Sequence, residues 1–78
     1  MSNESFFAHS VTYTFSREDA RIERLVVGAA REMAVTYGPV KFRIEQLSVS
    51  VSSTPAILDR FSETFSRRCK SLGLEFSR

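Results

Sequence analysis

The sequence predicts an α+β fold whose elements follow the order strand, helix, strand, strand, helix, strand. Apolar side chains alternate through residues 40–52 and change phase once near Glu45, a pattern typical of two strands joined by a reversal. The segments on either side of this stretch carry apolar residues at helical spacing, and each ends at a glycine.

Residues 6–15 are predicted to form the first strand. Phe7, Val11 and Tyr13 stand at odd positions. The hydroxylated residues between them are Ser10, Thr12 and Thr14. Because successive side chains of a strand point to opposite faces, this pattern predicts one apolar face and one polar face.

A helix is predicted to follow, with Ser16 as its N-cap and Asp19 completing a capping box. Glu18 adds negative charge to the expected first turn. The apolar stripe of this helix consists of Ile22, Leu25, Val26, Ala29 and Met33. Gly38 is expected to end the helix as a left-handed cap, and Pro39 follows it because proline cannot continue a helix.

The alternating stretch is predicted to form a hairpin of two strands, residues 40–45 and 47–52. The expected pairs are Ile44 with Leu47, Phe42 with Val49, and Val40 with Val51, which places all six side chains on one face. The connection lacks the glycine or asparagine that two-residue turns prefer. One long strand with a β-bulge near Glu45 is the alternative, because a bulge also resets the phase. We favour the hairpin.

The second helix is predicted to begin at Thr54 and Pro55, a capping hydroxyl followed by a proline at the first helical position. Gly73 is expected to end it. Its apolar face consists of Ile57, Leu58, Phe61, Phe65, Cys69 and Leu72. Leu74 and Phe76 then alternate with a polar residue and predict a short last strand.

This order of elements predicts a ferredoxin-like βαββαβ arrangement, with an antiparallel sheet and two helices on one of its faces. With one long bulged second strand the order becomes βαβα, and dimerisation would complete the sheet. We expect a polar, disordered N-terminus at residues 1–5 and a single α+β domain over residues 6–78. A chain this short buries only about 60% of its unfolded surface, so association with a second copy or a larger partner is a reasonable expectation.

The composition is that of a globular protein, with 42% hydrophobic residues, 26% charged residues and a net charge of +2. This charge is small for a protein that binds phosphate backbones. One cysteine, Cys69, rules out an internal disulfide and a cysteine-based metal cluster. We find neither a secretory signal nor a run of about eighteen apolar residues, so we expect a cytoplasmic protein without a membrane partner.

The sequence offers little equipment for catalysis. His9 is the only histidine, so no second imidazole is available to share a metal with it, and its strand parity predicts that it faces the helices. Cys69 lies in an apolar stripe, where buried thiols are inert. No phosphate-binding glycine loop or hydrolase motif occurs. We therefore expect no enzyme, no cofactor and no metal site.

Six basic side chains are the candidate partner-binding residues. Those on one stripe of the first helix are Arg17, Arg21, Arg24 and Arg31. Lys41 and Arg43 lie on the polar face of the expected sheet, among serine and threonine hydroxyls. Arginine is favoured at protein interfaces because its planar guanidinium makes several directed hydrogen bonds at once. The alternative for the helical stripe is an ordinary solvated face.

These features favour a small non-catalytic protein that binds another protein with an acidic surface. Adaptors, regulators and inhibitors, including those of phages and mobile elements, are of this kind. The second hypothesis is a nucleic-acid-binding accessory protein that uses the same arginines on phosphates. A homodimer is compatible with both hypotheses.

Overall fold

The structure, a computed structural model, describes residues 6–78. Its elements follow the predicted order of strand, helix, strand, strand, helix and strand. They are β1 (His9–Phe15), α1 (Arg21–Thr36), β2 (Lys41–Ile44), β3 (Ser48–Ser53), α2 (Pro55–Ser71) and β4 (Phe76–Ser77). The segment predicted to be disordered, residues 1–5, lies outside the described residues.

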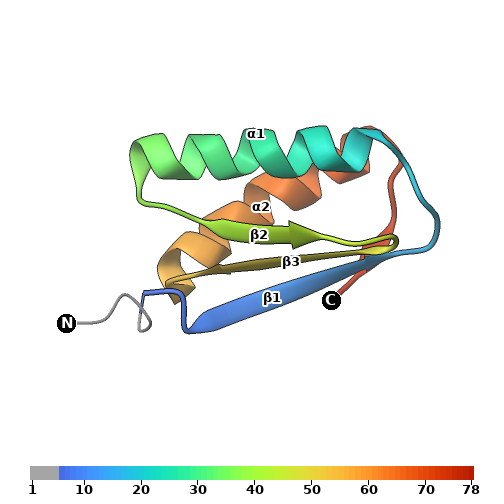
Figure 1. Ribbon diagram of the computed structural model, residues 1–78. Helices are drawn as coiled ribbons and strands as arrows, with labels where there is room; N and C mark the ends of the chain where they lie inside the picture. Colours follow the sequence, from blue (N-terminus) through green and yellow to red (C-terminus); the bar gives the residue numbers. More distant parts are fainter. Residues whose placement is uncertain (1–5) are drawn as a thin grey trace.

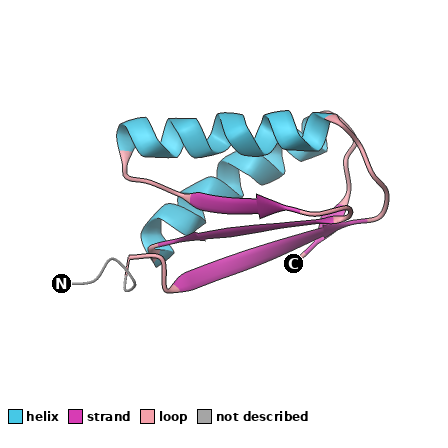
Figure 2. Cartoon of the chain, viewed as in Figure 1, coloured by secondary structure: helices cyan, strands magenta, loops and turns pink. Residues whose placement is uncertain are grey.

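The strands form one antiparallel sheet in the order β2-β3-β1-β4. Both helices lie on the same side of this sheet, and no described helix covers its other face (Figure 1). Colouring by secondary structure shows the same division into a helical layer and a strand layer (Figure 2). The predicted ferredoxin-like α+β arrangement is therefore confirmed, and the alternative with one long bulged strand is wrong.

The hairpin of β2 and β3 differs from the predicted register by two residues. Phe42 lies opposite Val51 and Ile44 lies opposite Val49, whereas the predicted partners are Val49 and Leu47. A shift by an even number of residues leaves each side chain on its predicted face. Val49 and Val51 are accordingly buried in the core.

The hairpin turn lies one residue later than predicted and is bonded to β1. The Glu45 N–H donates to the Ser48 carbonyl at 2.8 Å, which leaves Gln46 and Leu47 as the turn residues. The Leu47 carbonyl accepts from the Phe15 N–H at 2.7 Å. No non-glycine residue in the described chain has a positive φ, so the turn is not of the primed type that hairpins prefer. The bond from β1 therefore stabilises a turn that an isolated hairpin disfavours.

α1 begins at Arg21, whereas the sequence predicts a helix that begins directly after Ser16. The predicted capping box at Ser16 is therefore wrong. Residues 16–20 form the connection from β1, and Ala20 at the N-cap position makes no side-chain hydrogen bond. Asp19 still serves the helix start, because its Oδ1 accepts from the Arg21 N–H at 2.9 Å. A backbone donor that the helix leaves unpaired is thus satisfied from outside the helix.

The glycine after α1 lies at a close approach to α2 and has no left-handed backbone. The Gly38 N–H donates to the Met33 carbonyl at 2.8 Å, but among the described glycines only Gly73 has a positive φ. The predicted left-handed cap at Gly38 is therefore wrong. A Cβ at this position would lie 3.0 Å from Ile57 Cδ1 on α2, so a larger residue would press on that helix.

The boundaries of α2 are those that the sequence predicts. Thr54 Oγ1 accepts from the Ile57 N–H at 3.3 Å, and Pro55 occupies the first turn. Gly73 follows the helix with a φ of 74°, a conformation that side chains with a Cβ rarely adopt.

The core fills the space between the helices and the sheet. Its buried side chains are Tyr13, Phe15, Ile22, Val26, Ala29, Ala30, Met33, Val49, Val51, Ile57, Leu58, Phe61, Phe65, Cys69 and Leu74. Aromatic rings occupy its centre, where Tyr13 and Phe65 meet edge to face with 5.1 Å between their ring centroids. The aromatic contact joins β1 to α2, so it connects the two layers.

Candidate protein-interaction surfaces

The open face of the sheet is polar across its width. Its hydroxylated side chains are Ser10, Thr12, Thr14, Ser48, Ser50, Ser52 and Ser77. Strand pairing brings them side by side, and Thr12 Oγ1 lies 3.1 Å from Ser50 Oγ. On β3 these positions are half-buried and alternate with fully buried core residues, so the predicted division into two faces is confirmed there.

Lys41 and Arg43 add positive charge along the β2 side of this open face. The Arg43 side chain is 80% exposed, and its Nε lies 3.5 Å from a carboxylate oxygen of Glu45. Lys41 Nζ lies 4.7 Å from the centre of the Phe7 ring. Exposed contacts of this kind are weak. Both cations can therefore exchange these neighbours for a partner's groups.

The predicted arginine stripe on α1 is only partly formed. Arg17 lies in the connection before the helix, so its predicted place on the helix is wrong. Arg21 is the first helical residue and is held by Asp19, with 3.0 Å between Nε and Oδ1 and 2.8 Å between Nη2 and Oδ2. Arg24 and Arg31 are exposed. Within the described chain they form no ion pair.

The contact between Arg21 and Asp19 also lowers the pKa of the Asp19 carboxyl group. Hydrogen bonds from the Arg21 side chain bring the pKa of Asp19 down to about 2. The carboxylate is thus charged at neutral pH and offsets the charge of Arg21. A partner of the α1 surface would meet less positive charge than the sequence indicates.

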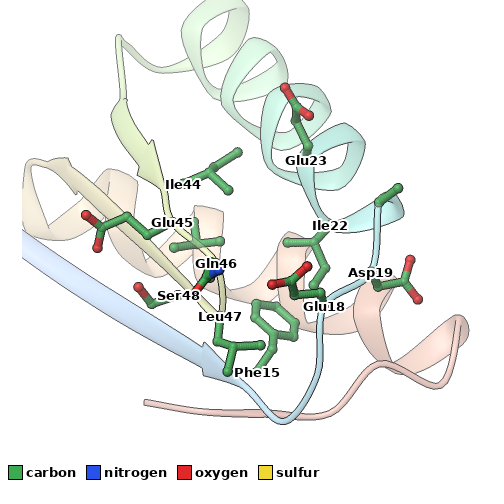
Figure 3. A pocket seen from close by; sticks show the side chains of 12 residues that line it. Phe15, Glu18, Asp19, Ile22, Glu23, Ile44, Glu45, Gln46, Leu47 and Ser48 are labelled. Atoms are coloured by element: carbon green, nitrogen blue, oxygen red, sulfur yellow. The ribbon is translucent and has the colours of Figure 1, made fainter.

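A groove opens between the hairpin turn and the start of α1, on the helical side of the sheet (Figure 3). Its volume is about 390 Å³. The buried side chains of Phe15, Ile22 and Val49 line it, together with Ile44 and Leu47, which are 36% and 41% exposed. Figure 3 shows apolar side chains from the hairpin facing those of β1 and α1 across this space.

Four acidic residues line the same groove, namely Glu18, Asp19, Glu23 and Glu45. Asp19 and Glu45 each lie within ion-pair distance of a neighbouring arginine. Glu18 and Glu23 form no ion pair in the described chain. The groove therefore combines an apolar lining with uncompensated negative charge.

The residue pattern alone did not indicate this groove. Glu18 was expected in the first turn of a helix, whereas it lies in the connection between β1 and α1. The lining comes from segments far apart in the chain, and only the fold brings them together. The one available signal was the turn sequence, because Ile44 and Leu47 at the tip of a hairpin leave apolar side chains near its end.

The two residues considered for catalysis, His9 and Cys69, differ in their exposure. His9 lies opposite the buried Ser53, so it is on the helical face of the sheet as predicted, but at the end of β1 its side chain is exposed. Cys69 is fully buried, and burial raises the pKa of its thiol to about 11. Among the described residues, no three His, Cys, Asp or Glu side chains are grouped so that they could hold a metal ion. No helix in residues 6–78 is long and apolar enough to cross a membrane.

The hydroxyl of Tyr13 is buried and has no hydrogen-bond partner in the described chain. Burial also raises the pKa of Tyr13.

An unsatisfied buried polar group costs about 1–3 kcal/mol, so Tyr13→Phe is expected to raise the free energy of unfolding by about 1 kcal/mol. Urea titration followed by circular dichroism measures this change. Tyr37→Phe is the control, since Tyr37 is 49% exposed and its substitution should change little. A lower midpoint for Tyr13→Phe would contradict the prediction.

No family model matches this chain, and neither a curated protein nor a solved structure does. A function can therefore be proposed only from the surfaces of the protein itself.

Proposed function

We propose that this protein is a non-catalytic protein-binding module whose open sheet face docks on an acidic surface of a partner protein. An adaptor, a regulator or an inhibitor would work in this way. One observation supports the proposal: seven hydroxylated side chains lie on the same uncovered face of the sheet as Lys41 and Arg43. We further propose a cytoplasmic location, where a lone thiol such as Cys69 stays reduced.

The chemistry of the open face suits a protein partner. Serine and threonine side chains lose little rotamer freedom on burial, and their hydroxyls both donate and accept hydrogen bonds. RNA-binding sheets of similar architecture instead carry aromatic rings on which bases stack. The residues of β1 and β3 at the corresponding positions are hydroxylated, so they provide no stacking surface.

The open face is a better candidate than the α1 surface. Lys41 and Arg43 share one strand and one face, and each is exposed. On α1, Arg21 is neutralised by Asp19, and Arg17 is not on the helix. Charge complementarity across an interface mainly sets the association rate and the choice of partner. Arg24 and Arg31 on α1 are exposed as well, so the open face is preferred because hydroxyls that donate and accept hydrogen bonds lie beside its two cations.

Two charge-reversal variants test the proposal. Lys41→Glu/Arg43→Glu changes the open face, and Arg24→Glu/Arg31→Glu makes the same change of net charge on α1. Tagged proteins are used to capture partners from cells of the source organism, and the captured proteins are quantified by mass spectrometry. The open-face variant is expected to lose the specific partner by about tenfold or more, because it places like charges against an acidic surface. The α1 variant is expected to retain it.

Thermal unfolding of both variants serves as the folding control, because all four positions are exposed. Retention by the open-face variant together with loss by the α1 variant would move the binding surface to the helix. Nuclease treatment and a salt series distinguish the second hypothesis. A nucleic-acid partner would be released by nuclease, and its affinity would fall steeply with salt because phosphate contacts release counterions.

A further inference from the structure

Within residues 6–78, the edge of the sheet at β2 has backbone hydrogen-bonding groups without a partner strand. β2 is the outermost described strand, and β3 is its one neighbour among the described strands. The Glu45 N–H bonds to the Ser48 carbonyl, and antiparallel pairs alternate between bonded and non-bonded, so Arg43 and Lys41 also bond to β3. The N–H and C=O groups of Phe42 and Ile44 therefore point away from the sheet. An exposed edge of this kind is a template for another strand.

The groove of Figure 3 lies next to this free edge. Ile44 belongs to both, because it lines the groove and its backbone groups point outward. Phe42 stands two residues earlier on the same face of β2 and is 41% exposed. A strand added beside β2 would place alternate side chains on this face, against Phe42, Ile44 and the start of α1.

The charge of the groove selects among such strands. The carboxylates of Glu18 and Glu23 form no ion pair with any described residue. Glu23 stands on α1 above Ile44, and Glu18 lies across the groove (Figure 3). A lysine or arginine beside apolar residues matches this arrangement, since its apolar stem can pack on the lining while its charged end reaches a carboxylate.

We propose that the groove between β2 and the start of α1 binds an extended basic peptide of a partner protein, which adds to the sheet as a further strand beside β2. Main-chain bonds to Phe42 and Ile44 supply the backbone recognition, and the groove reads every second side chain. The groove lies on the helical side of the sheet, whereas Lys41 and Arg43 lie on the opposite face of β2, beside the remaining side chains of the added strand. Substitutions at Glu18 and Glu23 change neither cation, so this proposal can be tested separately from the proposed function.

A second copy of the chain fits this edge less well. The residues of its β2 that would face the groove are Phe42 and Ile44, and these bring no positive charge to Glu18 and Glu23. Its cations, Lys41 and Arg43, would lie on the opposite face and would meet the same cations of the first copy. A partner peptide with a basic residue on the groove side avoids both problems.

A random twelve-residue peptide library displayed on phage, selected against the purified protein, is the first test. The expected peptides carry lysine or arginine and alternate with β-branched or aromatic residues. The tightest peptide is then synthesised with a fluorescent label, and its affinity is measured by polarisation. Failure to enrich any sequence, or enrichment of acidic sequences, would overturn the proposal.

Matched variants locate the bound peptide. Glu18→Gln/Glu23→Gln removes both groove charges with little change in shape, and about a tenfold loss of affinity is expected. Glu63→Gln/Glu75→Gln makes the same change of net charge at exposed positions outside the groove and should leave the affinity unchanged. Equal losses for the two variants would show that only the net charge matters, which contradicts a groove site.

Methylation of the peptide backbone tests the added strand. A strand beside β2 bonds to it through every second residue, so N-methyl groups at one parity should abolish binding and those at the other parity should not. Loss at both parities, or at neither, would contradict strand addition. Sedimentation of the protein without peptide is measured alongside. A dimer that Glu18→Gln/Glu23→Gln dissociates would assign the edge to a second copy and overturn the peptide proposal.

Discussion

Replacing Phe65 by alanine is expected to remove a large part of the stability of this protein. Truncation of a buried phenylalanine costs about 3–5 kcal/mol, because the transfer free energy of the ring is lost and a cavity remains. A domain of this size has only about 4–12 kcal/mol in total. Urea unfolding of Phe65→Ala, followed by circular dichroism, should therefore show a much lower midpoint or a chain already unfolded without urea.

The size of this effect follows from the position of the ring. Phe65 on α2 is fully buried. Its centroid lies 5.1 Å from that of Tyr13, 5.4 Å from that of Phe61 and 6.0 Å from that of Phe76. Phe76 belongs to β4, which has only two residues and pairs with the end of β1. The Phe65 ring thus helps hold the shortest strand against the sheet as well as joining α2 to β1.

Two further substitutions test whether the loss of stability comes from packing in the core. Leu72→Ala removes an apolar side chain at the end of α2 that is 41% exposed, and it should cost less than about 1 kcal/mol. Phe65→Leu keeps an apolar side chain in the core and should cost an intermediate amount. If Phe65→Ala cost no more than Leu72→Ala, the aromatic cluster would not be the centre of the core.

The helical stripes were predictable because they repeat over several turns. The face of α2 predicted to be apolar contains Ile57, Phe61, Phe65 and Cys69, and all of them are buried. The same holds for Ile22, Val26, Ala29 and Met33 on α1. Leu72 was assigned to the same face but lies at the C-cap, where the helix no longer covers it. Periodicity identifies the core face and says less about where the helix stops.

The errors arise where a distant segment decides the local structure. The pattern at Ser16 is a sound capping signal, but the chain must first pass from the sheet to the helical layer, so the helix begins at Arg21. The hairpin turn moves for a similar reason, since β1 bonds to Leu47. Neither contact can be found in the pattern of nearby residues.

The two candidate surfaces differ in the same way. The open face follows from the period of two along each strand, so its hydroxyls, Lys41 and Arg43 could be predicted together. The groove depends on how the connection before α1 folds over the hairpin. Its charged members, Glu18 and Glu23, become neighbours of Ile44 only through that contact.

Alkaline pH is expected to destabilise the protein through Cys69. Burial raises the pKa of this thiol from 9.0 to about 11. The unfolded chain therefore loses its thiol proton at a lower pH than the folded chain does. The stabilising contribution of the buried, neutral thiol is complete below pH 9 and is lost as the pH rises to about 11. The expected loss over this range is about 2 kcal/mol, measured by urea unfolding at a series of pH values.

Comparison with Cys69→Ala isolates the contribution of this thiol. The pKa of Tyr13 is also raised by burial, so its ionisation adds a further loss of stability above pH 10 in both proteins. The free energy of unfolding of the wild type should therefore fall more steeply than that of Cys69→Ala between pH 9 and about 11. Below this range the variant should have a slightly lower free energy of unfolding, because the substitution creates a cavity. Parallel curves for the two proteins would mean that the thiol ionises equally in the folded and unfolded states, which is incompatible with its burial between α2 and the sheet.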